Sequence, residues 1–152
     1  MVTLGWREWL ALPELGIPAI KAKIDTGART SALHAWGIEA YRAGRRRRVR
    51  FGVNPLQKNS RFSLLCDAEV VDERYVTDSG GHREKRLVIV TLAHLGPLAW
   101  PIEITLSDRE PMIFRMLLGR SALHHQCIVD PSRSYIQGRA LQRVYRNLKS
   151  GE

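Results

Sequence analysis

Hydrophobic and polar residues alternate along much of the chain, and this period of two is typical of strands with one buried face. Two such segments, 6–12 and 17–24, are separated by the turn residues of 13–16. Further strands are predicted at 49–53, 66–76, 84–92, 100–106, 128–129 and 134–136. The pattern therefore predicts a mainly β fold.

The segments between these strands predict loops, one long hairpin and two short helices. Residues 77–83 join two long strands and contain two glycines, so they are expected to form an exposed hairpin tip. Residues 25–35 are small and polar, which fits a tight loop with a short strand after it. The apolar run 112–118 predicts a buried strand that leads into a short helix at 119–124. A second helix is predicted at 139–149, where apolar residues recur at helical spacing at Leu141, Val144, Tyr145 and Leu148.

The composition fits one globular domain with an ordinary core. The chain has 152 residues, of which 44% are hydrophobic, and no segment repeats with a period of 20–50 residues. No stretch approaches the ~18 apolar residues of a transmembrane helix. Lys and Arg number 24 against 15 Asp and Glu, a net charge of +9. This excess predicts attraction to an acidic partner, and by itself it leaves nucleic acid, an anionic membrane and an acidic peptide open.

The cysteine content and the amino terminus predict a reduced environment. Cys66 and Cys127 are too few for a disulfide scaffold or a four-cysteine zinc site. The first nine residues lack a basic region followed by an apolar run, so they do not have the pattern of a secretory signal. We therefore expect a cytoplasmic protein with free thiols.

The segment Ile24-Asp25-Thr26-Gly27-Ala28 has the residue types of an aspartic-peptidase loop. The carboxylate at the end of an apolar strand supplies the reactive group. The hydroxyl can hydrogen-bond an equivalent loop, and the glycine lets the backbone approach the carboxylate. Tripeptides of this kind also occur in plain turns, so the segment by itself is a weak indication.

A second segment, Leu117-Leu118-Gly119-Arg120, closes an apolar run 92 residues after Gly27 (119 − 27). Together with the glycine-tipped hairpin, the two segments occur in the order found in retropepsins. The chain resembles the retropepsin-like aspartic endopeptidases, most closely the bacterial branch often labelled ATP-dependent zinc proteases. The resemblance runs from about residue 5 to about residue 138. Its most specific segments are 21–34, 114–120 and 129–135.

This resemblance implies a closed, retropepsin-like β-barrel over residues 1–138, followed by a C-terminal helix or tail over 139–152. It implies that Asp25 is the catalytic carboxylate and that Thr26 and Gly27 organise it. The remaining implied site residues are Ala28 and Arg29 at the substrate, Ser79, Gly80 and Gly81 in a flap over it, and Leu118, Gly119 and Arg120 in support of the loop.

The number of such loops predicts the assembly. Aspartic peptidases need two carboxylates about 3 Å apart that share one proton, because two like charges at that distance cannot both ionise. This chain has a single Asp-Thr-Gly segment. We therefore expect a twofold homodimer in which each subunit contributes its Asp25.

The chain departs from the retropepsin pattern at Arg29, where these enzymes usually carry an aspartate that pairs with the arginine equivalent to Arg120. Two arginines cannot pair with each other. One interpretation makes Arg29 an acceptor for an acidic substrate side chain, since a guanidinium binds a carboxylate bidentately. The other makes it a surface arginine with a structural partner. The bacterial branch is linked with ligases that add glutamates to protein termini, so glutamate-rich tails are the expected substrate.

Metal and nucleotide sites receive little support from the sequence. His124, His125 and Cys127 form the one cluster of metal-binding residue types, which is too few ligands, and a phosphate-binding glycine-rich loop is absent. We expect no metal and no cofactor. The basic run of Arg42 and residues 45–48 could bind phosphates, although a solvated loop is the favoured interpretation. Two alternatives thus stay open beside a peptidase: a non-catalytic module for acidic tails, and a nucleic-acid-binding β domain.

Overall fold

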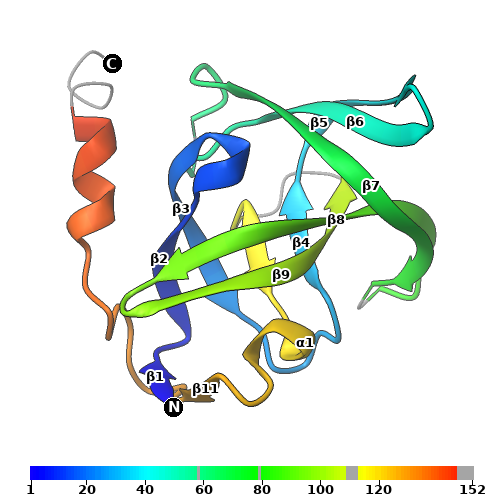
Figure 1. Ribbon diagram of the computed structural model, residues 1–152. Coiled ribbons are helices and arrows are strands. Elements are labelled where there is room, and N and C mark those ends of the chain that lie inside the picture. The colour runs from blue at the N-terminus through cyan, green and yellow to red at the C-terminus, as the bar shows by residue number, and fades with distance from the viewer. Residues whose placement is uncertain (58, 79, 109–112, 147–152) are drawn as a thin grey trace.

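The computed structural model describes residues 1–57, 59–78, 80–108 and 113–146 (Figure 1). Among these residues the strands form a nine-stranded sheet and a two-stranded sheet. The strand order of the large sheet is β2 (Arg7–Leu12), β3 (Ile17–Ile24), β10 (Met116–Leu118), β4 (Ser31–His34), β9 (Leu98–Ser107), β8 (Arg83–Leu95), β7 (Leu64–Thr77), β6 (Arg46–Val53) and β5 (Trp36–Ala43). The predicted mainly β fold is confirmed.

An additional pairing turns part of this sheet into a ring. Ala11 of β2 pairs with His94 of β8, so the strands from β2 through β3, β10, β4 and β9 to β8 close on themselves. The fully buried side chains of this part include Leu10, Ile20, Leu33, Ile89 and Ile104, which form the main core. β7, β6 and β5 continue beyond the ring as an arm (Figure 1). The closed arrangement expected for residues 1–138 therefore applies to the strands from β2 to β8, and not to β7, β6 and β5.

The shortest strand of the ring determines where the loops of the site meet. β10 lies between β3, to which it is parallel, and β4, to which it is antiparallel. Leu118 pairs with Ile24, so the ends of β3 and β10 lie side by side. The apolar run before β10 was expected to be strand as well, but residues 113–115 form a bend and Met112 lies outside the described residues.

The small sheet joins the two ends of the domain. β1 (Val2–Leu4), which the sequence pattern did not predict, pairs in parallel with β11 (Cys127–Val129). The strand predicted at 134–136 is wrong. The backbone N–H groups of Ile136 and Gln137 donate instead to the fully buried carboxylate of Glu8, at 3.0 and 3.1 Å. These amides are thus satisfied by a side chain rather than by a strand partner.

The helical elements are short. η1 (Pro13–Leu15) forms the predicted turn, with Gly16 at φ 73°, and α1 (Arg120–Leu123) is the predicted helix after β10. The C-terminal helix is a 3-10 helix, η2 (Ala140–Tyr145), and is shorter than expected. The Tyr145 side chain is buried against β2 and β3, and its hydroxyl donates to the backbone carbonyl of Ala19. The expected apolar position Val144 is half exposed, and Leu148 lies outside the described residues. The division into a domain and a tail stays a prediction.

Candidate active site

The Asp25 loop begins where β3 ends. The backbone N–H of Asp25 donates to the carbonyl of Leu118 at 2.9 Å, which attaches the start of the loop to β10. The backbone N–H of Gly27 donates to Oδ1 of Asp25 at 3.0 Å, so the turn orients the carboxylate. A Cβ on Gly27 would lie 3.2 Å from the same oxygen, which explains why a glycine suits this close approach.

Arg120 and its neighbour connect the second loop to the first. The backbone N–H of Arg120 donates to the carbonyl of Ala28 at 2.8 Å, and the Ser121 N–H donates to the carbonyl of Arg29 at 3.0 Å. The Arg120 Nη1 donates to the carbonyls of Thr26 and Gly27, both at 3.1 Å. These hydrogen bonds, together with the one from Asp25 to Leu118, join the two segments that the sequence indicated, and Arg120 holds backbone carbonyls rather than a carboxylate.

Gly119 lies where the two loops are closest. A Cβ at this position would be 2.6 Å from the backbone carbonyl of Thr30 and 3.0 Å from that of Ala28. The Gly119 N–H donates to the hydroxyl of the buried Ser31 at 3.1 Å. A side chain here would push the loops apart, so the close approach requires glycine.

A cleft of about 1290 Å³ opens in front of this loop. Its floor includes Asp25, Gly27, Ala28, Arg29, Leu117 and Arg120, and its wall on the long hairpin includes Arg74, Tyr75, Val76, Thr77, Asp78 and Arg86. Of the other predicted site residues, Thr26, Gly80 and Gly81 are exposed outside the lining, Leu118 and Gly119 are buried beneath it, and Ser79 lies outside the described residues. The structure therefore brings the Asp25 loop and the hairpin to one cleft.

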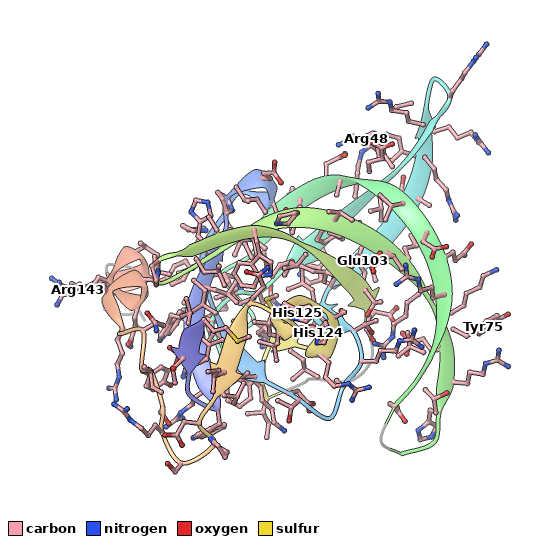
Figure 2. The ribbon with its side chains drawn as sticks, turned by 60° about the horizontal axis from the view of Figure 1, so that its bottom comes forward. Arg48, Tyr75, Glu103, His124, His125 and Arg143 are labelled. Atoms are coloured by element: carbon pink, nitrogen blue, oxygen red, sulfur yellow. The ribbon has the colours of Figure 1, made fainter. Side chains whose placement is uncertain are left out.

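Two sets of contacts shape the hairpin of β7 and β8. At the tip, Oδ1 of Asp78 accepts the N–H groups of Gly80 and His82, both at 2.9 Å, which fixes the turn. On the outer face, the Tyr75 ring lies 4.1 Å from the guanidinium carbon of Arg83, and Figure 2 shows the ring pointing away from the sheet. The Tyr75 side chain therefore belongs to the outside of the hairpin, although the residue also borders the cleft.

An ion pair ties the hairpin to the ring. The guanidinium of Arg74 on β7 donates to both carboxylate oxygens of Glu103 on β9, at 3.0 and 2.9 Å, and also to Asp72 at 2.7 Å. The hydrogen bonds from Arg74 hold the pKa of Glu103 below its ordinary value. Sequence analysis missed these residues, because nothing in the local pattern indicates that positions 74 and 103 face each other across β8.

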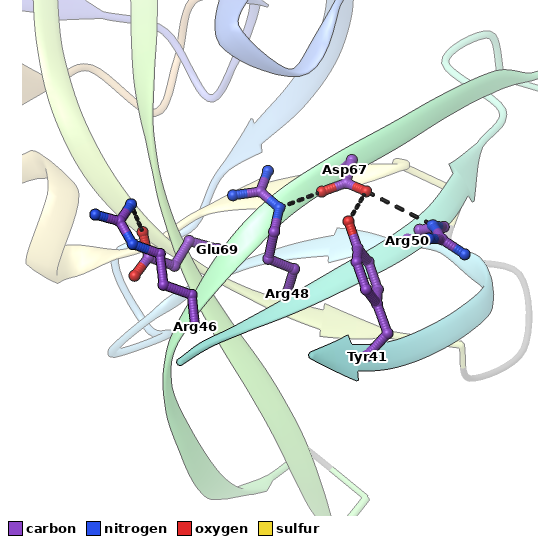
Figure 3. A network of polar contacts seen from close by, with 6 residues as sticks. All are labelled: Tyr41, Arg46, Arg48, Arg50, Asp67 and Glu69. Carbon is purple, nitrogen blue, oxygen red and sulfur yellow. Dashed lines mark hydrogen bonds and ion pairs between the residues drawn. The ribbon is translucent and has the colours of Figure 1, made fainter. Parts of the chain in front are cut away.

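The basic run was expected in a solvated loop, but most of it is strand: Arg42 lies on β5, Arg46 to Arg48 lie on β6, and Arg45 lies in the turn between them. This hairpin is far from the loop of Asp25 along the sheet (Figure 1). Arg46 pairs with Glu69 at 3.5 Å, and Arg48 and Arg50 pair with Asp67 at 2.7 and 3.8 Å (Figure 3). Arg47 likewise pairs with Glu73, at 3.2 Å. Carboxylates of the same arm therefore compensate much of the charge that could bind phosphates.

The described residues show no group of three or more His, Cys, Asp or Glu side chains that could hold a metal ion. His124 and His125 are exposed, with ring centroids 3.9 Å apart. Cys66 and Cys127 are free thiols, and burial raises the pKa of Cys66 to about 11. Among the residues that the structure describes, no helix is long and apolar enough to cross a membrane.

Curated proteins from other organisms are similar to this chain. Two curated proteins named probable alpha-L-glutamate ligase are similar to the chain: one from Shewanella pealeana at 44% identity over 135 residues, and one from Desulfotalea psychrophila at 45% over 129 residues. These matches cover 89% and 85% of this chain but only 30% and 28% of the relatives. The chain thus spans less than a third of the length of the curated relatives it matches.

A solved structure and a family model cover nearly the whole chain. The crystal structure of Lpg0085, a protein of unknown function from Legionella pneumophila, superposes with a TM-score of 0.74 at 25% identity, covering 90% of this chain and 98% of that one. The family model described as RimB-like, retropepsin-like aspartic endopeptidase RimB, matches residues 3–140. The family predicted from the sequence is therefore confirmed: the chain belongs to the RimB-like family of retropepsin-like aspartic endopeptidases.

Proposed function

We propose that the chain is one subunit of a homodimeric aspartic peptidase in which two Asp25 carboxylates, one from each copy, hydrolyse a peptide bond. The observation that carries this proposal is the position of Asp25, on a loop fixed by Leu118 and Gly27 at the floor of the cleft. Membership of the family supports it further.

The count of carboxylates in the cleft supports the dimer. Besides Asp25, the described lining residues include two acids, Asp78 and Glu103. Asp78 accepts hydrogen bonds from its own turn, and Glu103 is held bidentately by Arg74. Neither is available as a proton-sharing partner, so the second carboxylate would come from another copy of the chain, by twofold symmetry.

The reaction needs the two carboxylates in opposite protonation states. The ionised one removes a proton from a water molecule, whose oxygen attacks the carbonyl carbon of the scissile bond, while the protonated one donates its proton to the carbonyl oxygen. Collapse of the tetrahedral intermediate then transfers a proton to the leaving nitrogen and breaks the C–N bond. The Gly27 N–H would hold each Asp25 in orientation through Oδ1.

The first test is Asp25→Asn in the full chain. It removes the ionisable group while keeping the shape of the side chain, so we expect peptide hydrolysis to fall by about 10²–10⁴-fold. Asp108→Asn is the matched control, because Asp108 is exposed and does not line the cleft, and it should keep full activity. Equal activity of the two variants would refute the proposal.

A mixing experiment tests the shared site. If each active unit needs Asp25 from two copies, wild-type and Asp25→Asn chains mixed in equal amounts should form mixed dimers that are inactive. The activity per wild-type chain would then drop to about one half, by random pairing. Unchanged activity after full subunit exchange would show that one chain works alone, and would refute the dimeric site.

We further propose glutamate-rich protein tails as the substrate. The net charge of +9, the exposed Arg29 in the cleft and the glutamate ligase names of the relatives support an acidic substrate. An oligoglutamate peptide should be cleaved faster than a neutral peptide at low salt, and equal rates would contradict this choice. Tight binding of oligoglutamate without any Asp25-dependent cleavage would favour the alternative, a non-catalytic module for acidic tails.

A further inference from the structure

The arginines of the cleft divide into two kinds. Four arginines line the cleft, and two of these have carboxylate partners within the fold. Arg74 binds Glu103, and Nε of Arg86 lies 3.4 Å from Oε1 of Glu84. The other two are Arg29 and Arg120, both exposed, and neither guanidinium pairs with a carboxylate in the described part of the chain. These two cations therefore carry positive charge that the subunit itself does not compensate.

The backbones of Arg29 and Arg120 are also neighbours in space, and both residues line the same cleft. Their segments are joined by the hydrogen bonds from Arg120 N–H to the Ala28 carbonyl and from Ser121 N–H to the Arg29 carbonyl. The Arg120 guanidinium is fixed by Nη1, which donates to the carbonyls of Thr26 and Gly27. A guanidinium has five N–H donors, so Arg120 keeps donors for a ligand, and the side chain of Arg29 makes no hydrogen bond with any described residue.

We propose that Arg29 and Arg120 of each subunit together bind one carboxylate of the substrate, so that the dimer selects an acidic side chain on each side of the bond it cuts. This inference rests on the proposed function, because it needs both the dimer and the position of Asp25. An extended peptide that crosses the twofold axis meets one subunit before the scissile bond and the other after it. Each half of the peptide then faces one arginine pair.

The chemistry of the pair favours a carboxylate side chain over neutral groups. Guanidinium groups bind carboxylates through charge-assisted, often bidentate hydrogen bonds, which a glutamine amide of the same size cannot reproduce. Because both cations lie on the loops that carry and support Asp25, a bound carboxylate would sit close to the scissile bond rather than at a remote surface. The preference should therefore concern the residues next to that bond.

The decisive experiment uses the wild-type full chain and four peptides that differ only at the two residues flanking the cut: glutamate on both sides, on either side alone, or glutamine on both. Replacing one glutamate should lower kcat/KM by about ten- to a hundredfold, the size of a charge-assisted hydrogen bond, and the two losses should be similar and multiply. The preference should also shrink at high salt.

Variants then assign the effect to the pair. Arg29→Met should bring the glutamate-to-glutamine rate ratio toward one, and Arg29→Lys should keep part of it. Arg45→Met is the matched control, because Arg45 is an exposed turn residue outside the cleft and its loss changes the net charge equally. It should keep the wild-type ratio. Arg120→Lys is measured in the same way after a thermal unfolding check, since Arg120 also holds the loop.

The outcomes separate this inference from the proposed function. Asp25-dependent cleavage with equal rates for all four peptides, or a preference on one side only, would overturn the inference and leave the peptidase intact. An unchanged ratio in a folded Arg29→Met variant would overturn it as well. Absence of Asp25-dependent cleavage of every peptide would refute the proposed function and the inference with it.

Discussion

A single added methyl group at Gly119 should damage both the stability of this protein and the peptidase activity proposed for it. Gly119 has φ −97° and ψ 177°, which any residue adopts, so the cost of Gly119→Ala is steric. The new Cβ would lie 2.6 Å from the Thr30 carbonyl group, and ordinary contact begins at 3.4 Å, so the backbone must retreat by about 0.8 Å. Overpacking of this kind costs about 1–3 kcal/mol of unfolding free energy.

The same displacement moves the loop that carries Asp25. Ala28 and Thr30 lie three and five residues after Asp25 on the same loop. A shift of their backbone would therefore move the Asp25 carboxylate, whose position catalysis requires within a fraction of an ångström. A misplacement near 1 Å lowers catalytic rates by about a hundredfold, so we expect a loss of ten- to a hundredfold in peptide hydrolysis.

Urea unfolding and peptide hydrolysis are the two assays. The matched control for stability is Gly80→Ala, whose Cβ would meet only flexible side chains, with His82 Nδ1 nearest at 3.2 Å. Its unfolding free energy should stay within about 0.5 kcal/mol of wild type. If Gly119→Ala unfolds like this control and keeps full activity, the close contact between the two loops is not as the structure has it.

Three further predictions concern buried groups outside the site. The Glu8 carboxylate accepts three backbone N–H groups at 2.7, 3.0 and 3.1 Å, and each amide left unsatisfied costs about 1–3 kcal/mol. Glu8→Ala should therefore lower the free energy of unfolding in urea by about 3–9 kcal/mol, and Glu8→Gln by less; near-neutral values for both would contradict this role. Burial raises the pKa of Tyr145 from its ordinary value of 10.0 to about 12, so the phenol ionises at a lower pH in the unfolded chain than in the folded one. Above pH 10 this ionisation favours the unfolded state. The stability that this hydroxyl contributes should thus be fully present below pH 10 and decline between pH 10 and 12, and a Tyr145→Phe variant that declines just as steeply over that range would disprove the assignment. Burial also raises the pKa of Cys66 to about 11, so the native thiol should react with iodoacetamide at pH 8 at least tenfold more slowly than in urea, as followed by mass spectrometry; equal rates would mean that the thiol is accessible.

Local pattern predicted most of the large sheet. The bounds of β3, Ile17–Ile24, agree with the prediction, because turn residues precede the strand and apolar residues alternate at Ile20, Ala22 and Ile24. The long hairpin was also predicted, and the structure extends each of its strands by a few residues. β5 was missed, since its residues are largely exposed and its apolar alternation is limited to Trp36, Ile38 and Ala40. The helix at the C-terminus was predicted as regular helix, but its described part is a 3-10 helix in which Tyr145 is buried and Leu141 is partly buried.

The candidate site was predicted in its residues and not in its geometry. The Asp-Thr-Gly segment and the Leu-Leu-Gly-Arg segment were recognised because their residue types are informative on their own. Their contact depends on β10 lying between β3 and β4, a pairing of strands about 90 residues apart (116 − 22 = 94) that no local pattern encodes. The pairing of Arg74 with Glu103 has the same origin.

By itself, the sequence determined the strand pattern, the positive charge and the family, because these depend on the order and type of neighbouring residues. Only the tertiary structure decided which charges are free to act. It compensates Arg46, Arg47 and Arg48 with carboxylates from β7, and it leaves Arg29 and Arg120 without a carboxylate among the described residues, next to Asp25. The physical reason is that the partner of a side chain is set by strand register and sheet order, which bring together residues that are far apart in the chain.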